Sequence, residues 1–311
     1  MSLKSAIVSF FENLYYRPRG YHWIVAFSLL PLSLLYGSVQ WVRRRTIKPH
    51  APGIPVVSIG NLQVGGSGKT PMTIALARHF DNVAVVLRGY GRKSRGLRVV
   101  SRRGRIECGV EEAGDEATLL ARSLPKATVI VAEDRMDGIE KAKALGAKAV
   151  FLDDGFSKIG IQKFDILLQK PQIPNPLPLP SGPFREFLWE RERADLLLRE
   201  GRDFRRIVTC EGCDEAPLML VTAIADPARL EPYLPSNVVG RYILPDHAWF
   251  DEEAIRRAMA ACGAEKILTT EKDRVKLEAF SLPTALLKLE IAVDESLVEI
   301  VNTWINRGYN C

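Results

Sequence analysis

The sequence predicts an α/β fold with a mainly parallel sheet flanked by helices, and three observations support this prediction. Short runs of apolar and β-branched residues, typical of buried strands, alternate with segments of helical periodicity. The first of these runs ends in a glycine-rich loop that leads directly into a helical segment. The chain has 311 residues, 47% of them hydrophobic, which is enough for two domains that each bury a core.

The glycine-rich loop is the most specific motif in the chain. A predicted strand over 56–60 precedes it, and an amphipathic helix is expected from Lys69 to about Phe80. Glycines let backbone N–H groups turn inward, and the free N–H groups of a helix N-terminus point to the same place, so such a loop holds phosphate. Lys69 adds a positive charge and Thr70 is placed to ligate Mg²⁺. We predict a P-loop that binds a nucleoside triphosphate through Gly65, Gly66, Ser67, Gly68, Lys69, Thr70 and Pro71.

Further apolar runs at 83–87, 129–132 and 149–153 are predicted strands of the same sheet. The last of them ends in Asp153 and Asp154, and a P-loop protein commonly holds Mg²⁺ or its waters from this position. The ligand site of a parallel sheet lies at the carboxyl ends of its strands. We therefore expect the residues that follow these strands to converge on one edge of the sheet.

Charged segments follow two of these strands, and each has two interpretations. No acidic residue occurs from Arg88 to Arg105, so this segment is either a solvated loop or a clamp for a phosphorylated substrate or an anionic surface. Nucleic acid is disfavoured as a ligand because Tyr90 is the only aromatic residue there. The acidic run 111–116 either opens a helix in the usual way or projects Asp115 into a cleft.

Net charge and cysteine usage indicate the kind of partner and the redox compartment of the protein. The formal net charge of +6 favours an acidic partner such as a nucleotide, an anionic substrate or a phospholipid surface. An odd number of scattered cysteines fits a reducing compartment. Cys210 and Cys213 have metal or redox spacing, but without a second pair nearby we expect two ordinary thiols.

The amino-terminal segment predicts attachment to a membrane. No charged residue occurs from Tyr21 to Val42, and arginines flank this stretch on both sides, where they would meet anionic lipid. Pro31 is expected to break its middle, and Trp23 and Trp41 are residue types that lie at the headgroup boundary. We therefore favour a monotopic attachment over a full span.

In the second half of the chain, a proline-rich stretch and a polar segment interrupt the alternation of predicted strands and helices. A proline-rich stretch at 171–183 is too long for a tight connection and is expected to be a functional loop, followed by a last strand near 195–198. The segment 202–215 is polar and linker-like. An α/β pattern restarts at Leu218, with a helix expected from Pro227 toward Leu234, which predicts a smaller second domain.

Short motifs spread in order along the chain resemble the tetraacyldisaccharide 4'-kinase family of lipid A biosynthesis. The amino-terminal run 31–37 also resembles the membrane-associated helix of that family. The motifs that carry the resemblance lie at 65–71, 88–90, 112–116, 133–135, 152–156, 182–186, 245–247 and 269–273.

The resemblance implies an enzyme that uses ATP and Mg²⁺ to phosphorylate the 4' hydroxyl of a lipid A disaccharide 1-phosphate. It implies a protein at the cytoplasmic face of the inner membrane, and we expect a monomer. The implied segments are a membrane-associated helical region over 1–45, a P-loop kinase domain over 46–203, a smaller α/β domain over 211–285 and a C-terminal helix over 294–311. A two-stranded linker over 204–210 and 286–293 would join the domains.

The resemblance also assigns roles to individual residues. A catalytic carboxylate and a histidine that holds or tunes it map onto Asp115 and His247. These two residues belong to different predicted domains, so we expect the pair to form only when a cleft between the domains closes. Lys69, Asp153 and Asp154 would neutralise charge during transfer. The candidates for substrate binding are Arg88, Tyr90, Arg92, Arg185 and Glu186.

Two departures and two rival functions accompany this interpretation. Ser157 and Lys158 stand where the family usually has Gln-His, and Ala223 to Pro227 stand where it tends to have glycines. A kinase for a soluble small molecule is the nearer rival, and detergent dependence of activity would separate the two. A nucleotide-driven switch is the other rival, and it would hydrolyse nucleotide without an acceptor.

Overall fold

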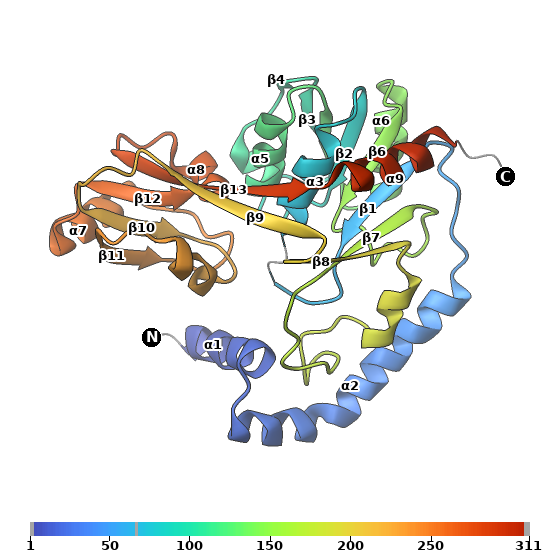
Figure 1. Cartoon of the computed structure of the whole chain (residues 1–311), viewed down its shortest axis with the longest axis horizontal. Coiled ribbons are helices and arrows are strands. Elements are labelled where there is room, and N and C mark those ends of the chain that lie inside the picture. The colour runs from blue at the N-terminus through green and yellow to red at the C-terminus, as the bar shows by residue number, and fades with distance from the viewer. Residues whose placement is uncertain (1–2, 66–67, 308–311) are drawn as a thin grey trace.

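The computed structural model describes residues 3–65 and 68–307, which form two β-sheets with helices packed against them (Figure 1). Two long strands of the second sheet connect it to the first. The first sheet has eight strands in the order β4-β3-β5-β2-β6-β1-β7-β8. Strands β5, β2, β6, β1, β7 and β8 are mutually parallel, as predicted. The strands span Val56–Gly60 (β1), Val83–Leu87 (β2), Arg98–Arg102 (β3), Arg105–Ile106 (β4), Thr128–Val131 (β5), Ala149–Asp153 (β6), Phe164–Gln169 (β7) and Leu196–Arg199 (β8).

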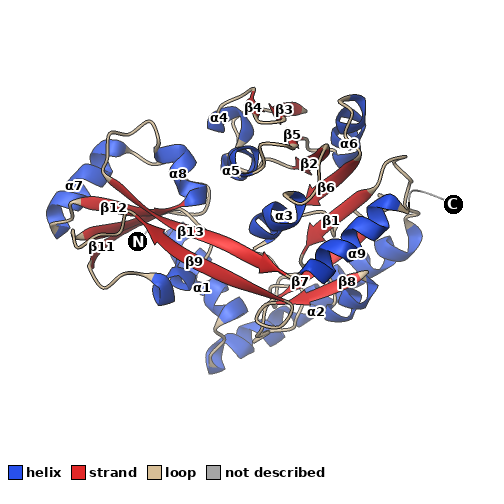
Figure 2. Ribbon diagram, turned by 45° about the horizontal axis from the view of Figure 1, so that its top comes forward, coloured by secondary structure: helices blue, strands red, loops and turns tan. Residues whose placement is uncertain are grey.

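Helices cover both faces of this sheet because its central strands are apolar on both sides. Helices α3 (Lys69–Ala77), α5 (Asp115–Ser123) and α9 (Glu295–Asn306) pack on one face, and α6 (Arg135–Ala144) packs on the other. The short helix α4 (Val110–Ala113) directly precedes α5. Figure 2 shows α3 and α5 on the side of the first sheet that faces the second sheet. Residues at the N-termini of α3 and α5, namely Lys69, Thr70 and Glu116, line the space between the two sheets.

The second sheet has five strands in the order β11-β10-β12-β13-β9. Four of them are parallel, whereas β9 runs antiparallel to β13 over a register from Phe204↔Val293 to Leu286↔Glu211. Helices α7 (Glu252–Cys262) and α8 (Glu271–Leu277) and the 3₁₀ helix η2 (Pro227–Tyr233) accompany it. The strands span Phe204–Glu211 (β9), Leu218–Thr222 (β10), Val238–Ile243 (β11), Lys266–Thr270 (β12) and Thr284–Val293 (β13).

Two local expectations for this half of the chain, the separate thiols and the helix toward Leu234, were wrong. The polar segment 202–215 contains the regular strand β9, whose exposed and more buried residues alternate, so its polarity marks an open face and not a loop. Cys210 and Cys213 form a disulfide across the turn that follows β9, with Cα atoms 5.7 Å apart, and are not two separate thiols. The helix expected toward Leu234 is only the short η2, which has Pro232 inside it.

The amino-terminal residues form two helices, α1 (Leu3–Tyr16) and α2 (Gly20–Thr46), and α2 runs along the lower edge of the molecule in Figure 1. One face of α2 is buried against the segment that contains the 3₁₀ helix η1 (Leu188–Arg193) and is lined by His22, Ala26, Ser33 and Gly37. Pro31 does not break α2, which continues from Gly20 to Thr46 with Pro31 at an exposed position inside it. Among the described residues, α2 is the one helix long and apolar enough to cross a membrane, with a mean hydropathy of 1.5.

Candidate functional site

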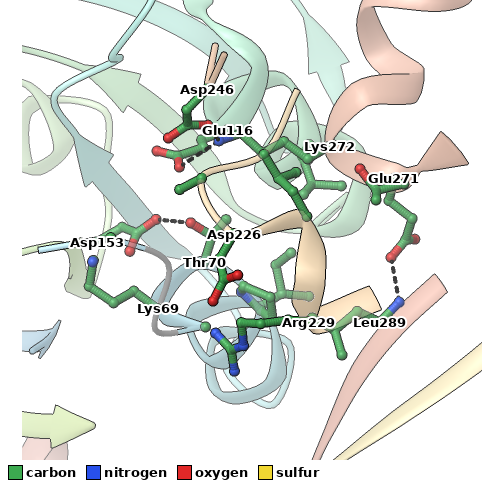
Figure 3. Close-up of a pocket in the computed structure, with 18 of the residues that line it drawn as sticks. Lys69, Thr70, Glu116, Asp153, Asp226, Arg229, Asp246, Glu271, Lys272 and Leu289 are labelled. Carbon is green, nitrogen blue, oxygen red and sulfur yellow. Dashed lines mark hydrogen bonds and ion pairs between the residues drawn. The ribbon is translucent and has the colours of Figure 1, made fainter. Parts of the chain in front are cut away.

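A cleft of about 570 Å³ lies between the two sheets, and the motifs singled out in the sequence meet on its walls (Figure 3). The P-loop contributes Gly65, Gly68, Lys69 and Thr70. The ends of β2 and β6 contribute residues next to them, because parallel strands that start on the same side also end on the same side. The opposite wall comes from β9, β13, η2 and the segments that follow β11 and β12.

The P-loop joins β1 to α3 in the predicted way. Gly68 has φ +84°, a left-handed conformation that glycine adopts without strain, and it directly precedes the first helical residue, Lys69. The Lys69 Nζ lies 3.2 Å from Asn61 Oδ1 and 3.5 Å from Asp154 Oδ1. Gly66 and Ser67 lie outside the described residues. Lys69 thus already points toward the aspartates that follow β6.

The two aspartates after β6 differ in their surroundings. Thr70 Oγ1 donates a 2.7 Å hydrogen bond to Asp153 Oδ2, while Asp153 Oδ1 is buried without a partner among the described residues. Burial raises the pKa of Asp153, and the nearby Glu116 raises it further. Burial would also raise the pKa of Asp154, but Lys69 and Arg185 outweigh it and hold the pKa below its usual value. A hydroxyl and a carboxylate oxygen that lacks a partner are the donors that Mg²⁺ prefers.

Asp115 and His247 meet across the cleft. Asp115 opens α5 directly after Gly114, which has φ +87°, and its Oδ1 and Oδ2 lie 3.0 and 3.1 Å from His247 Nδ1. The contact exists in this structure without any further closure. His247 lines the cleft, while the Asp115 side chain, only 3% exposed, lies behind it.

The charges around this pair favour an ionised carboxylate. Burial would raise the pKa of Asp115, but the hydrogen bond from His247 and the charge of Lys272 outweigh it and hold the pKa at about 2. The same hydrogen bond raises the pKa of His247 above its ordinary value, against the opposing effect of burial. Asp115 therefore stays ionised and stabilises the protonated form of His247.

The predicted substrate-binding residues divide into two groups. Arg88, Tyr90 and Arg185 line the cleft, and Arg185 Nη1 lies 3.2 Å from Asp154 Oδ1. Arg92 and Glu186 are not among the residues that line the cleft. The Arg92 side chain is 3% exposed and pairs with Glu133, and Glu186 pairs with Arg44 on α2. These two residues hold elements together, so we do not include them in the proposed substrate site.

Several cleft residues were not assigned from the sequence. Lys272 Nζ lies 3.1 Å from Asp246 Oδ1 and 3.5 Å from Glu116 Oε1, so it joins acids of both sheets (Figure 3). Arg135 opens α6 and lines the cleft with its side chain largely buried. These residues all adjoin or lie within motifs that were recognised, and proximity to those motifs was the available signal. Arg206 on β9 also reaches the P-loop, but its polar surroundings in the sequence gave no such signal.

A P-loop next to a buried aspartate, with a carboxylate and histidine pair across the same cleft, defines a phosphotransferase of the P-loop class. Comparisons with known proteins identify the family within this class. The family model described as tetraacyldisaccharide-1-P 4'-kinase (LpxK) matches residues 25–212 and 206–306. The chain belongs to this family.

Relatives and a solved structure agree with this assignment. A tetraacyldisaccharide 4'-kinase of Aliarcobacter butzleri is 45% identical over 98% of this chain and 99% of its own length. One of Campylobacter jejuni is 41% identical over 94% of this chain and 95% of its own length. A crystal structure of LpxK from Aquifex aeolicus in complex with ATP is 29% identical, has a TM-score of 0.74, and covers 90% of this chain and 99% of its own. The predicted family, fold class and kinase activity are confirmed.

Proposed function

We propose that this chain transfers the γ-phosphoryl group of ATP to the 4' hydroxyl of a tetraacyldisaccharide 1-phosphate, which yields the 1,4'-bisphosphate in lipid A biosynthesis. The observation that carries this proposal is the shared cleft. Lys69, Thr70 and Asp153 lie on the wall that the first sheet provides, and His247 comes from the second sheet and contacts Asp115 of the first. Phosphoryl transfer needs charge neutralisation and in-line placement of the acceptor, and a cleft with these two walls suits both needs.

The P-loop wall would bind the triphosphate. Backbone N–H groups at the α3 N-terminus would face the phosphates, and Lys69, which lines the same cleft, would contact the transferred group. Thr70 and Asp153 would hold Mg²⁺, with Asp154 next to them. When bound, the ion neutralises charge on the phosphate oxygens. Arg185, held by Asp154, would contact the transferring group from the side.

The opposite wall would take the proton of the sugar hydroxyl. His247 Nδ1 is engaged with Asp115, and its Nε2 lies 3.6 Å from Asp246 Oδ2, a residue that also lines the cleft. A histidine with one nitrogen fixed by a carboxylate accepts a proton at the other. Asp115 and His247 would thus act together as the general base, and Arg88 and Tyr90 would face the anionic substrate.

The substrate is a lipid, so we propose attachment to the cytoplasmic face of the inner membrane through α2. The outward face of α2 exposes large apolar side chains, among them Ile24, Phe27 and Leu35, and arginines occupy its last turn. This combination suits a bilayer with anionic headgroups. A monotopic position remains our expectation, as does a monomer.

The decisive experiment incubates the full chain with γ-labelled ATP, Mg²⁺ and tetraacyldisaccharide 1-phosphate in mixed micelles. We expect a labelled bisphosphate, and removal of Mg²⁺ with a chelator should abolish it. An unacylated disaccharide phosphate is the matched acceptor control, because a kinase for soluble substrates would label it equally well. Phosphate release that does not depend on any acceptor would instead favour a nucleotide-driven switch.

We further expect Asp115→Asn and His247→Gln to lower kcat by about 10²-fold or more, the usual contribution of a general base. The KM for ATP should stay close to that of the unchanged chain, because neither residue belongs to the P-loop and their contacts are with each other and not with Lys69 or Thr70. Turnover within tenfold of the unchanged chain would remove Asp115 from the role of base.

A further inference from the structure

A buried lysine lies behind the Asp115 and His247 pair and takes no part in the mechanism described so far. Lys276 belongs to α8 of the second sheet, and only 2% of its side chain is exposed. Its Nζ lies 3.3 Å from Asp115 Oδ2, 3.4 Å from Asp273 Oδ1 and 3.1 Å from the carbonyl oxygen of Ala248. Burying an ammonium group costs free energy unless the group is paired and hydrogen-bonded. These three oxygen atoms supply the partners that a buried, charged Lys276 needs.

The Asp115 carboxylate is fixed from three directions. The backbone N–H of Glu116 donates to Oδ1 at 2.8 Å, Lys276 approaches Oδ2, and His247 Nδ1 lies between the two oxygens. Lys276 and His247 both come from the second sheet, whereas Asp115 comes from the first. The lysine thus limits rotation of the carboxylate on the side that the backbone N–H does not reach.

Lys276 and His247 also share one support within the second sheet. Asp273 Oδ2 accepts hydrogen bonds from Thr222 Oγ1 at 2.7 Å and from the backbone N–H of Ala223 at 3.1 Å. The carbonyl of Ala223 in turn accepts the backbone N–H of His247 at 3.2 Å. Asp273, which pairs with Lys276, is therefore linked through the backbone of Ala223 to the backbone of His247.

We propose that Lys276 is a positioning residue for phosphoryl transfer, which fixes the Asp115 carboxylate across the two sheets and balances its charge so that His247 can accept a proton near neutral pH. This inference rests on the proposed role of Asp115 and His247. Without the ammonium, the negative charge of Asp115 would act on the histidine with less compensation. The imidazolium would then be stabilised, and the histidine would hold its own proton to a higher pH.

Other charged groups near the histidine do not replace Lys276. Lys272 is directed to Asp246 and Glu116, at 3.1 and 3.5 Å, and the ring of Tyr90 stacks on the imidazole at 6.4 Å between centroids. Within the described part of the chain, His247 and Lys276 contact Oδ2 of Asp115, and Lys276 is the lysine that reaches this oxygen. The titratable and charged groups that face His247 or its partner are Asp115 and Glu116 from α5, Asp246 from its own loop, Tyr90, and Lys272, Asp273 and Lys276 from α8.

The first test compares Lys276→Met with Lys266→Met in the full chain. Lys266 is a matched control because it pairs with Asp214 on the same sheet, away from the cleft. For Lys276→Met we expect kcat at pH 7 to fall by about 10- to 100-fold, with the KM for ATP changed by less than about threefold. The acid limb of the pH profile of kcat should move up by about one unit, so that the loss shrinks at high pH. A loss of equal size at every pH would mean a merely structural role and would overturn the proposal.

The second test measures the histidine directly and does not need turnover. The His247 pKa is followed by NMR titration of the full chain with ¹⁵N-labelled histidine in detergent micelles, with His247→Gln to assign the signal. It should rise in Lys276→Met and in Lys276→Gln, a variant that keeps a polar group if the methionine variant does not fold. An unchanged pKa in a folded variant overturns the proposal.

The outcomes also separate this inference from the proposed function. If Asp115→Asn and His247→Gln lose turnover while both Lys276 variants keep kcat and pH profile, only the role of Lys276 is wrong. If Asp115→Asn and His247→Gln keep turnover, the proposed general base itself is wrong.

Discussion

At the scale of single residues, the site depends on carboxylates that look alike in the sequence and differ in their surroundings. Asp153 is enclosed, and one of its oxygens has no partner among the residues that the structure describes, whereas Asp154 faces two cations. Asp115 is equally buried but has His247 and Lys276 against it. Burial alone raises a carboxyl pKa, and cations and hydrogen bonds lower it, so the neighbours decide which acid stays charged.

The depressed pKa of Asp115 predicts how acid affects stability. The folded-state pKa of about 2 lies below the ordinary value of 3.8, so the charged group stabilises the fold above about pH 4, and this contribution is lost as the pH falls through 2. We expect Asp115→Asn to be less stable than the unchanged chain at pH 7 by roughly 2 kcal/mol, with the gap closing toward pH 2. Thermal melting between pH 6 and pH 2.5 measures it, and the exposed Asp137→Asn is the control. A gap that does not change with pH would contradict the assignment.

The sequence predicted those site residues whose role follows from local structure. Lys69 and Thr70 must lie at a helix N-terminus, and Asp153 must lie at the end of a strand, wherever the domains are placed. Lys276 pairs with Asp115 and Glu116 pairs with Lys272 because α5 and α8, which belong to different sheets, pack against each other. Such a contact depends on tertiary packing that periodicity and spacing do not encode. The pairing of Glu186 was unpredictable for the same reason, because its partner Arg44 is 142 residues away in the chain.

At the scale of elements, α2 is held to the P-loop domain by a close approach that only glycine permits. A Cβ atom at Gly37 would lie 2.6 Å from the ring of Phe187, which is itself stacked on Trp189. We expect Gly37→Ala to lower the free energy of unfolding by about 1–3 kcal/mol through overpacking, although alanine favours the helix itself. Gly20→Ala, at the open start of the same helix, is the control and should be neutral. Thermal melting in detergent compares them, and equal melting temperatures would refute this packing argument.

The outward face of α2 supports a separate prediction on membrane attachment. Leu35 is 65% exposed on this face, and a charge there would oppose insertion into the acyl region. We expect Leu35→Glu to reduce cosedimentation with vesicles that contain phosphatidylglycerol. Ile207→Glu, at a 47% exposed position of β9, is the matched control and should bind as before. Equal loss in both variants would show that α2 is not the attachment surface.

Among the elements, the apolar strands and the amphipathic helices were predictable from their own pattern, whereas β9 was placed only by the family resemblance, as one strand of the two-stranded linker. Strands β1, β2 and β6 are buried along their whole length and therefore read as continuous apolar runs. Strand β9 keeps one open face, so half of its residues are charged or polar and it resembles a linker. Its partner β13 comes 80 residues later, and pairing at this distance leaves no local pattern.

At the scale of the whole molecule, the two sheets share one cleft, and several ion pairs join the two halves of the chain. Asp115 with His247, Glu116 with Lys272, and Arg122 with Glu278 all join the first sheet to the second. β9 and β13 connect the same two halves covalently, and β13 packs on α3. The P-loop and the general base are therefore positioned by the relative placement of the sheets and not by either sheet alone.

This arrangement predicts that nucleotide stabilises the whole chain. A ligand that binds only the folded state adds about 2.7 kcal/mol when its concentration is a hundred times the Kd. Because residues from both sheets line the cleft, ATP with Mg²⁺ should raise the melting temperature of both halves together. Lys69→Met should lose most of this shift, while Lys126→Met, which removes an exposed lysine paired with Asp81, should keep it. A full shift in Lys69→Met would place the nucleotide elsewhere, and separate transitions with only one of them raised would show that the cleft does not couple the two sheets.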